Sequence, residues 1–155
     1  MWDSLVNFVH LLATAVWLGG AIFIKAILEP ATKTIDPREA GKLQSSIAKR
    51  FTITAWSSII LLIITGIMKT PPGMWFDLSS DVGTILTIKH ILILVVVVIG
   101  LIIGFVAVPR LQRSAPAPGS APSDDFLKAN KSLLRLSLIS TITGVFIVFC
   151  ASFLW

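Results

Sequence analysis

Charged side chains are scarce in this chain of 155 residues. They account for 14% of it, whereas a soluble domain carries roughly 25%. The shortage is concentrated in four long apolar stretches, which are separated by short polar segments. The pattern excludes an ordinary water-soluble core and indicates that lipid is the solvent for most of the protein surface.

Cysteine is nearly absent, and so are the marks of a cleaved signal peptide. The one cysteine, Cys150, cannot form an intramolecular disulfide. No basic segment precedes the first apolar stretch and no small-residue cleavage site clearly closes it, so we expect a retained helix. The net charge is +5. Because lysine and arginine commonly decorate the cytoplasmic loops of membrane proteins, we expect no nucleic-acid partner.

The four apolar stretches have the length of membrane-spanning helices, which need about 20 residues. We expect these helices at residues 4–28, 51–69, 83–109 and 126–154. Pro30 and Pro109 are expected to end the first and the third, because proline disfavours helix in the residue before it. The predicted fold class is all-α: an integral membrane four-helix bundle of up-down-up-down topology, forming a single transmembrane domain over residues 1–155.

Two of the polar segments carry structural signals of their own. Asp36 followed by Pro37 is typical of a helix start, and we expect a short cytoplasmic helix at about 37–50. Residues 114–125 are rich in proline, alanine and serine, which predicts a flexible linker. Asp124 or Asp125 is then expected to cap the last helix.

The basic residues predict the orientation, because cytoplasmic loops hold an excess of lysine and arginine. Ten of the thirteen lie in the first and third loops, and Lys25 lies at the same end, whereas the other side keeps only Lys69 and Lys89. The ten are Lys33, Arg38, Lys42, Lys49, Arg50, Arg110, Arg113, Lys128, Lys131 and Arg135. We therefore expect a multi-pass protein of the plasma membrane with both termini outside.

The chain has two histidines, His10 and His90, and both lie inside predicted spans. Ionisable residues in a span are costly and indicate function. Each lies about six residues into its helix, and the first and third helices of the predicted bundle run parallel, so both imidazoles are expected at one depth. Two imidazoles facing each other suit the axial positions of a haem iron. The sequence thus predicts one haem b, bound by His10 and His90 near the outer face.

Four further residues are expected around this haem. Trp17 can pack against the macrocycle, and Thr14 and Thr87 are candidates for hydrogen bonds that tune the site. Lys89 points about 100° away from its neighbour His90. It either snorkels outward or pairs with a haem propionate or an acidic substrate.

Other interpretations of the two histidines stay open. They can bind a different metal, or they can simply form hydrogen bonds to a neighbouring helix. Met68 and Met74 lie near the predicted outer surface, where their soft sulfur atoms suit copper.

Three stretches resemble the CopD-like family of membrane proteins. The first is residues 10–23, HLLATAVWLGGAIF, where a histidine precedes Trp-Leu-Gly-Gly. The second is residues 50–68, RFTITAWSSIILLIITGIM, and the third is residues 83–111, GTILTIKHILILVVVVIGLIIGFVAVPRL. The resemblance implies a role in copper resistance or copper uptake.

The chain is also similar to the HemJ-type protoporphyrinogen oxidases, a four-helix group thought to bind haem b. Their first-helix histidine and third-helix lysine correspond to His10 and Lys89. This sequence departs from that pattern by placing His90 beside the lysine, which favours a bis-histidine cytochrome.

The sequence thus predicts a haem b-binding membrane protein that transfers electrons, because two imidazole ligands leave no open position on the iron. A quinone or a redox partner protein at the membrane surface is the expected partner. Two alternatives stay open: copper transport or resistance, and a HemJ-like protoporphyrinogen oxidase. Enzymatic activity and a homodimer within the lipid bilayer are both left undecided.

Overall fold

The computed structural model describes residues 1–116 and 123–154, except for the side chains at 37, 38, 41, 42 and 45. Most of the flexible linker expected at 114–125 therefore lies outside the described residues. The chain forms two compact units, Met1–Trp75 and Phe76–Trp155. All regular elements in the described part are helical, which confirms the all-α class.

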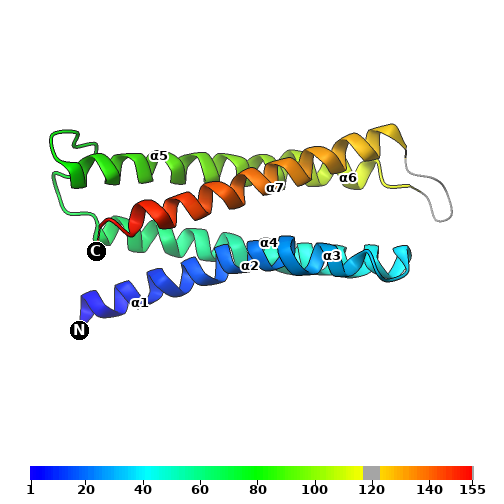
Figure 1. Ribbon diagram of the computed structural model, residues 1–155, viewed down its shortest axis with the longest axis horizontal. Coiled ribbons are helices and arrows are strands. Elements are labelled where there is room, and N and C mark those ends of the chain that lie inside the picture. Colours follow the sequence, from blue (N-terminus) through cyan, green and yellow to red (C-terminus); the bar gives the residue numbers. More distant parts are fainter. Residues whose placement is uncertain (117–122, 155) are drawn as a thin grey trace. The chain divides into compact units, whose positions relative to one another are not determined.

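The first unit is a hairpin of two long helical runs (Figure 1). The first run comprises α1 (Trp2–Thr14), the π-helical η1 (Ala15–Gly19), α2 (Gly20–Phe23), the π-helical η2 (Ile24–Leu28) and α3 (Glu29–Thr32). The second run is α4 (Pro37–Lys69), which joins the helices expected at 37–50 and 51–69 into one. As the sequence predicts, Asp36 lies at its start, where Oδ1 accepts a 3.4 Å hydrogen bond from the backbone N–H of Glu39.

The second unit is also a helical hairpin. It comprises α5 (Asp81–Ile102), the π-helical η3 (Ile103–Ala107), α6 (Val108–Arg113) and α7 (Asp124–Ala151). Neither Asp124 nor Asp125 is the cap of α7. The side chain of Ser123 takes that role, since its Oγ accepts a hydrogen bond from the backbone N–H of Phe126 at 3.2 Å.

Two helical runs continue past a proline, contrary to the expectation that Pro30 and Pro109 end them. η2 and η3 each finish two residues before the proline, and the helices then extend to Thr32 and Arg113. A proline inside a helix lacks an N–H, and its ring collides with the carbonyl four residues earlier. The wider π-helical turn next to each proline relieves this collision, so the helix continues instead of stopping.

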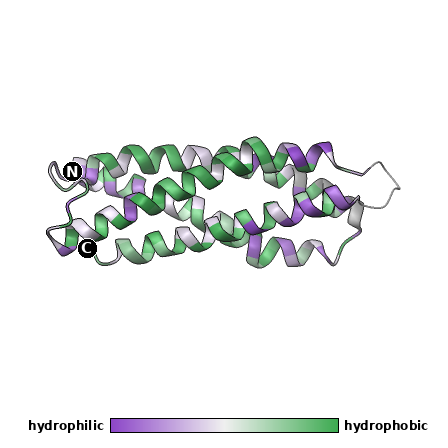
Figure 2. Ribbon diagram, turned by 90° about the horizontal axis from the view of Figure 1, so that it is seen from above, coloured by the Kyte–Doolittle hydropathy of each residue, from purple (hydrophilic) through white to green (hydrophobic). Residues whose placement is uncertain are grey.

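The surface of the helices matches a lipid environment. In the described part, four helices are long and apolar enough to cross a membrane: Trp2–Thr32, Ser46–Lys69, Asp81–Arg113 and Asp124–Ala151. Hydrophobic residues cover their middle parts and hydrophilic residues gather toward their ends (Figure 2). Many large apolar side chains are exposed, among them Phe8, Ile60 and Phe105. Lipid tails can cover such side chains, so the chain is a multi-pass membrane protein.

Small side chains make up much of the buried surface. In the first unit these are Ala13, Ser58 and Thr65, and in the second they include Ala107 and Ala129. Helices in lipid gain little from burying large apolar groups and instead associate through close backbone approach and hydrogen bonds. Small residues therefore contribute to the packing of each hairpin.

A tight turn follows α4 at the end of the first unit. The backbone N–H of Met74 donates a 3.2 Å hydrogen bond to the carbonyl of Pro71, and Gly73 has a φ of 90°. This positive φ at the third residue is typical of a type II turn, in which glycine is favoured there and proline precedes it. The turn fixes Met74 close to the end of α4.

A second turn precedes α5. Asp77 accepts hydrogen bonds from the Ser79 hydroxyl at 2.6 Å, the Ser79 backbone N–H at 2.8 Å and the Ser80 hydroxyl at 2.8 Å. These bonds, with those from Ser79 the strongest, hold the pKa of Asp77 below its ordinary value. Ser80 in turn caps α5 by accepting from the backbone N–H of Gly83.

Candidate functional site

His10 lies on α1 and faces α4 within the first unit. Its Nδ1 is 2.7 Å from Oγ1 of Thr65. The Thr65 side chain is buried, with 5% of the residue exposed, and its hydroxyl also donates a 2.6 Å hydrogen bond to the backbone carbonyl of Leu61. The imidazole is thus joined to the backbone of α4 through one threonine.

The imidazole of His10 lies close to Gly66 on α4. A Cβ added at Gly66 would lie 3.9 Å from Cε1 of His10, which is an ordinary van der Waals distance. The ring edge that carries Nδ1 and Cε1 therefore lies against Thr65 and Gly66. Small residues at such positions let helices in lipid approach closely.

A second polar contact joins α1 and α4 next to the first. The ammonium of Lys69 donates a 2.7 Å hydrogen bond to Oδ1 of Asn7. Asn7 and His10 are three residues apart on α1, and Thr65 and Lys69 are four residues apart on α4, so each pair shares one helix face. The two contacts form a polar ladder, which we define as Asn7, His10, Thr65 and Lys69.

A tight apolar contact lies further along the same two helical runs. A Cβ at Gly20 would approach Cε2 of Phe51 to 2.5 Å, whereas a Cβ at Gly19 would meet nothing within 4 Å. Of the two glycines in the Trp-Leu-Gly-Gly motif, Gly20 is therefore the one on which the ring of Phe51 packs. The contact joins α2 to α4 and so helps to fix the register between the two antiparallel helical runs.

Two of the predicted site residues accompany His10 in the first unit. The Thr14 hydroxyl donates a 2.8 Å hydrogen bond to the backbone carbonyl of His10, which is a bond within the helix and not to the imidazole. Trp17 lies in η1, two helical turns further along, and is partly exposed. Their expected roles around a haem stay predictions.

The other three predicted residues lie on α5 in the second unit. The Thr87 hydroxyl donates a 2.9 Å hydrogen bond to the backbone carbonyl of Gly83. Lys89 is partly buried on α5, next to His90. His90 is partly buried. The joint role predicted for His10 and His90 stays a prediction.

Sequence reasoning did not connect Asn7, Thr65 and Lys69 to His10. Thr65 is one of several hydroxyl residues in the second span, and its spacing does not set it apart. Since α1 and α4 run antiparallel, the residue opposite His10 depends on the register between them. The pair Thr65-Gly66 could have indicated this face of the second span, because a hydroxyl residue beside a glycine favours close, hydrogen-bonded packing against another helix.

Metal ligands are few in this chain. Among the described residues, no group of three or more His, Cys, Asp or Glu side chains could hold a metal ion. Methionine supplies soft donors in the first unit. Met68 lies on α4 one residue before Lys69, Met74 follows in the turn after that helix, and both are at least partly exposed. The end of the first unit that contains His10 therefore also contains the sulfur atoms of Met68 and Met74.

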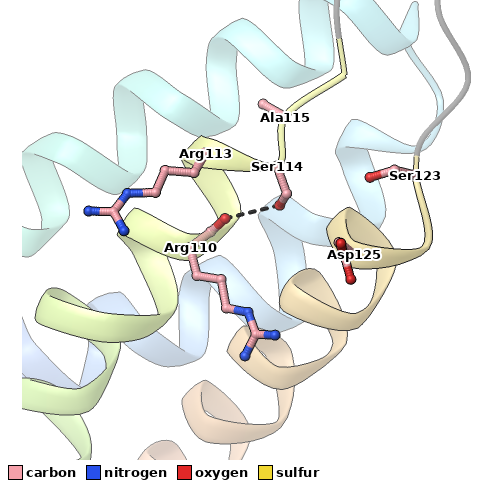
Figure 3. Close-up of a pocket in the computed structure, with 6 residues that line it drawn as sticks. All are labelled: Arg110, Arg113, Ser114, Ala115, Ser123 and Asp125. Atoms are coloured by element: carbon pink, nitrogen blue, oxygen red, sulfur yellow. Dashed lines mark hydrogen bonds between the residues drawn. The ribbon is translucent and has the colours of Figure 1, made fainter.

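A hollow in the second unit is lined mainly by charged and hydroxyl residues. It has a volume of about 470 Å³ and is lined by Arg110, Arg113, Ser114, Ala115, Ser123 and Asp125. Figure 3 shows both arginines projecting from α6, and the Ser114 hydroxyl donating a 3.0 Å hydrogen bond to the carbonyl of Arg110. These residues include no imidazole or sulfur ligand, so the hollow does not suit a soft metal ion.

Comparison with known families gives a match over most of the chain. Residues 45–154 match the family described as copper resistance protein D. The match covers the second, third and fourth spans, with Thr65 and His90, but not the first span with His10. No curated protein and no solved structure matches the chain. The match confirms the CopD-like resemblance and spans more than half of the chain, and the protein therefore belongs to the copper resistance protein D family.

Proposed function

We propose that the protein binds monovalent copper at the His10 end of its first helical hairpin, as a step in moving or sequestering copper at the membrane. The observation that carries the proposal is the 2.7 Å contact between His10 and Thr65 inside a membrane span. An ionisable side chain inside a span is energetically costly, so its presence there indicates a function. Membership of the copper resistance protein D family supports copper as the metal that is bound.

The donor atoms near His10 favour the monovalent ion. Met68 lies on α4 three residues after Thr65, a rise of about 4.5 Å along the helix, and the adjacent turn fixes Met74. Thioether sulfur selects Cu(I) among the common biological metals, and imidazole also suits copper. One imidazole and two thioethers are thus the proposed ligands.

The charge distribution supports copper arriving from outside. In the topology that the sequence predicts, only Lys69 and Lys89 among the basic residues lie on the side with both termini. The excess of basic residues favours the cytoplasm for the other side. In this orientation, His10, Met68 and Met74 lie toward the outer face of a plasma membrane. Single cysteines introduced into a Cys150→Ser background test this: an impermeant thiol reagent should label residue 74 and not residue 34 in intact cells.

Competition titration with a chromogenic Cu(I) chelator tests the copper site. Purified protein in detergent should take one Cu(I) from the chelator, and His10→Ala should lower its affinity at least about tenfold. Met68→Leu and Met74→Leu keep side-chain volume and should each weaken binding. His90→Ala is the matched control, since it removes an imidazole from the second unit and should leave the affinity unchanged. Equal affinities of wild-type protein and His10→Ala would contradict the proposal.

A second function, haem b binding with electron transfer, is favoured by one observation. His10 is eight residues after the start of α1 at Trp2, and His90 is nine residues after the start of α5 at Asp81. Such similar positions within the two helices support the sequence-based prediction of bis-histidine ligation of one haem. In that case the partner would be a quinone or a redox protein.

The visible spectrum separates the two functions. Protein expressed with ample haem should be colourless if the site is for copper alone. Sharp low-spin bands that disappear in both His10→Ala and His90→Ala would instead establish the bis-histidine haem. Loss of the bands in His10→Ala but not in His90→Ala would point to Lys89 or a methionine as the second ligand.

A further inference from the structure

The hydroxyl of Thr65 has one hydrogen and two close neighbours. It lies 2.6 Å from the carbonyl oxygen of Leu61 and 2.7 Å from Nδ1 of His10. A carbonyl oxygen can only accept, whereas an imidazole nitrogen either donates or accepts, depending on the tautomer. The hydroxyl therefore gives its hydrogen to Leu61, and the short contact with His10 is satisfied only if Nδ1–H donates to Thr65.

This pattern decides which nitrogen of His10 carries the proton. In a neutral imidazole, a proton on Nδ1 leaves the lone pair on Nε2. We propose that Thr65 is a positioning residue that holds His10 in its Nδ1–H tautomer and thereby makes Nε2 the atom that binds the metal. The proposal rests on the proposed function for the identity of that metal, but its statement about the proton does not.

The surroundings of Thr65 suit a positioning role. The residue is 5% exposed, its branched side chain has few rotamers, and its hydroxyl is held by the Leu61 carbonyl one turn earlier. A Cβ added at the neighbouring Gly66 would lie 3.9 Å from Cε1 of the same imidazole, so the ring lies close to this glycine. The ring is therefore fixed in both tautomer and orientation.

Thr65 acts through His10 and does not itself bind the metal. Its hydrogen is committed to Leu61, and one of its lone pairs accepts from Nδ1–H. Metal-binding histidines generally donate their second N–H to a carboxylate, carbonyl or water, which fixes the ring and raises its basicity. Here a threonine hydroxyl that is polarised by a backbone carbonyl takes the place of that partner.

Nitrogen NMR of the copper-free protein tests the proton assignment. With ¹⁵N-labelled histidine the chain gives two imidazole signals, and His90→Gln identifies that of His10. In the wild-type protein, Nδ1 of His10 should have the shift of a protonated nitrogen and Nε2 that of an unprotonated one. Thr65→Val, which keeps the shape and removes the hydroxyl, should shift the population toward Nε2–H. Thr65→Ser, which keeps the hydroxyl, should retain Nδ1–H.

Two NMR results would overturn the proposal: an Nε2–H tautomer in the wild-type protein, or no change of tautomer in a folded Thr65→Val protein. The Cu(I) titration adds a second readout, in which Thr65→Val should weaken binding by about 10- to 100-fold and Thr65→Ser should remain close to wild type. If His10→Ala loses copper while Thr65→Val changes neither tautomer nor affinity, the positioning role fails and the copper site stands. If the tautomer follows Thr65 while His10→Ala keeps full copper affinity, the copper site fails and the proton assignment stands.

Discussion

Lys69 on α4 donates a 2.7 Å hydrogen bond to the side-chain oxygen of Asn7 on α1, one turn from the contact between His10 and Thr65. The two contacts join the same pair of helices. A lysine at the end of a span is tolerated when its ammonium reaches a polar partner or the interface. The Asn7–Lys69 contact therefore fixes the register that places Thr65 opposite His10.

Replacing Asn7 should weaken the first hairpin. Asn7→Leu removes one acceptor of the Lys69 ammonium, and a hydrogen bond to a charged group contributes about 1.5–3 kcal/mol. The expected result is a lower Tm in detergent, measured by circular dichroism. The double variant Asn7→Leu with Lys69→Met removes both polar groups and should recover most of the loss. Equal stability of the wild-type and Asn7→Leu proteins would show that the contact does not hold the helices together.

Adding a methyl group at Gly20 should also destabilise the hairpin. The new Cβ would lie 2.5 Å from Cε2 of Phe51, and overpacking of this kind costs about 1–3 kcal/mol. Gly20→Ala should therefore lower the Tm. The substitution should weaken metal binding only indirectly, since the contact lies more than two helical turns from His10.

Gly19→Ala is the matched control for Gly20→Ala. The added Cβ meets no atom within 4 Å, and alanine is a better helix former than glycine by roughly 0.5–1 kcal/mol. The Gly19→Ala protein should be as stable as wild type or more so. Phe51→Leu combined with Gly20→Ala should regain part of the stability. A greater loss from Gly19→Ala than from Gly20→Ala would contradict the packing described for this motif.

The turn before α5 should respond to acid. Asp77 accepts bonds from Ser79 and Ser80, and its pKa lies below the ordinary value of 3.8. A lowered pKa in the folded state means that the bonds add stability at pH values above 3.8. This contribution is lost as the pH falls through the lowered pKa, where the carboxylate becomes protonated. NMR titration of the Ser79 amide signal should follow this change.

Ser79→Ala should raise the pKa of Asp77 toward its ordinary value, because it removes the hydrogen bond that lowers this pKa most. Ser79→Thr keeps a hydroxyl and should leave the midpoint nearly unchanged. An identical midpoint for the wild-type and Ser79→Ala proteins would mean that the side-chain bond does not act on the carboxylate.

The number of membrane-spanning helices could be predicted from the sequence because each apolar stretch is long enough for a bilayer and is bounded by polar residues. The helix ends were less predictable. Prolines such as Pro30 and Pro109 commonly end a helix, yet here a π-helical turn precedes each proline and the helix continues past it. The start of α4 at Pro37 was predictable, because Asp36 caps the helix by accepting a hydrogen bond from Glu39, only three residues away.

The site could be predicted only in part for a related reason. His10 was identifiable because an ionisable residue in an apolar stretch stands out in the sequence. Its partner Thr65 lies 55 residues away and is one of several threonines and serines in its span. Only the packing of α1 and α2 on α4 selects Thr65 from among them, through the Asn7–Lys69 and Gly20–Phe51 contacts.

The most direct test of the copper site is X-ray absorption spectroscopy at the copper edge of the Cu(I)-loaded protein. The expected spectrum shows one imidazole nitrogen together with sulfur neighbours, with the imidazole contribution absent in His10→Ala and unchanged in His90→Ala. Copper coordinated without imidazole, or an unaltered spectrum in His10→Ala, would contradict a site built on His10.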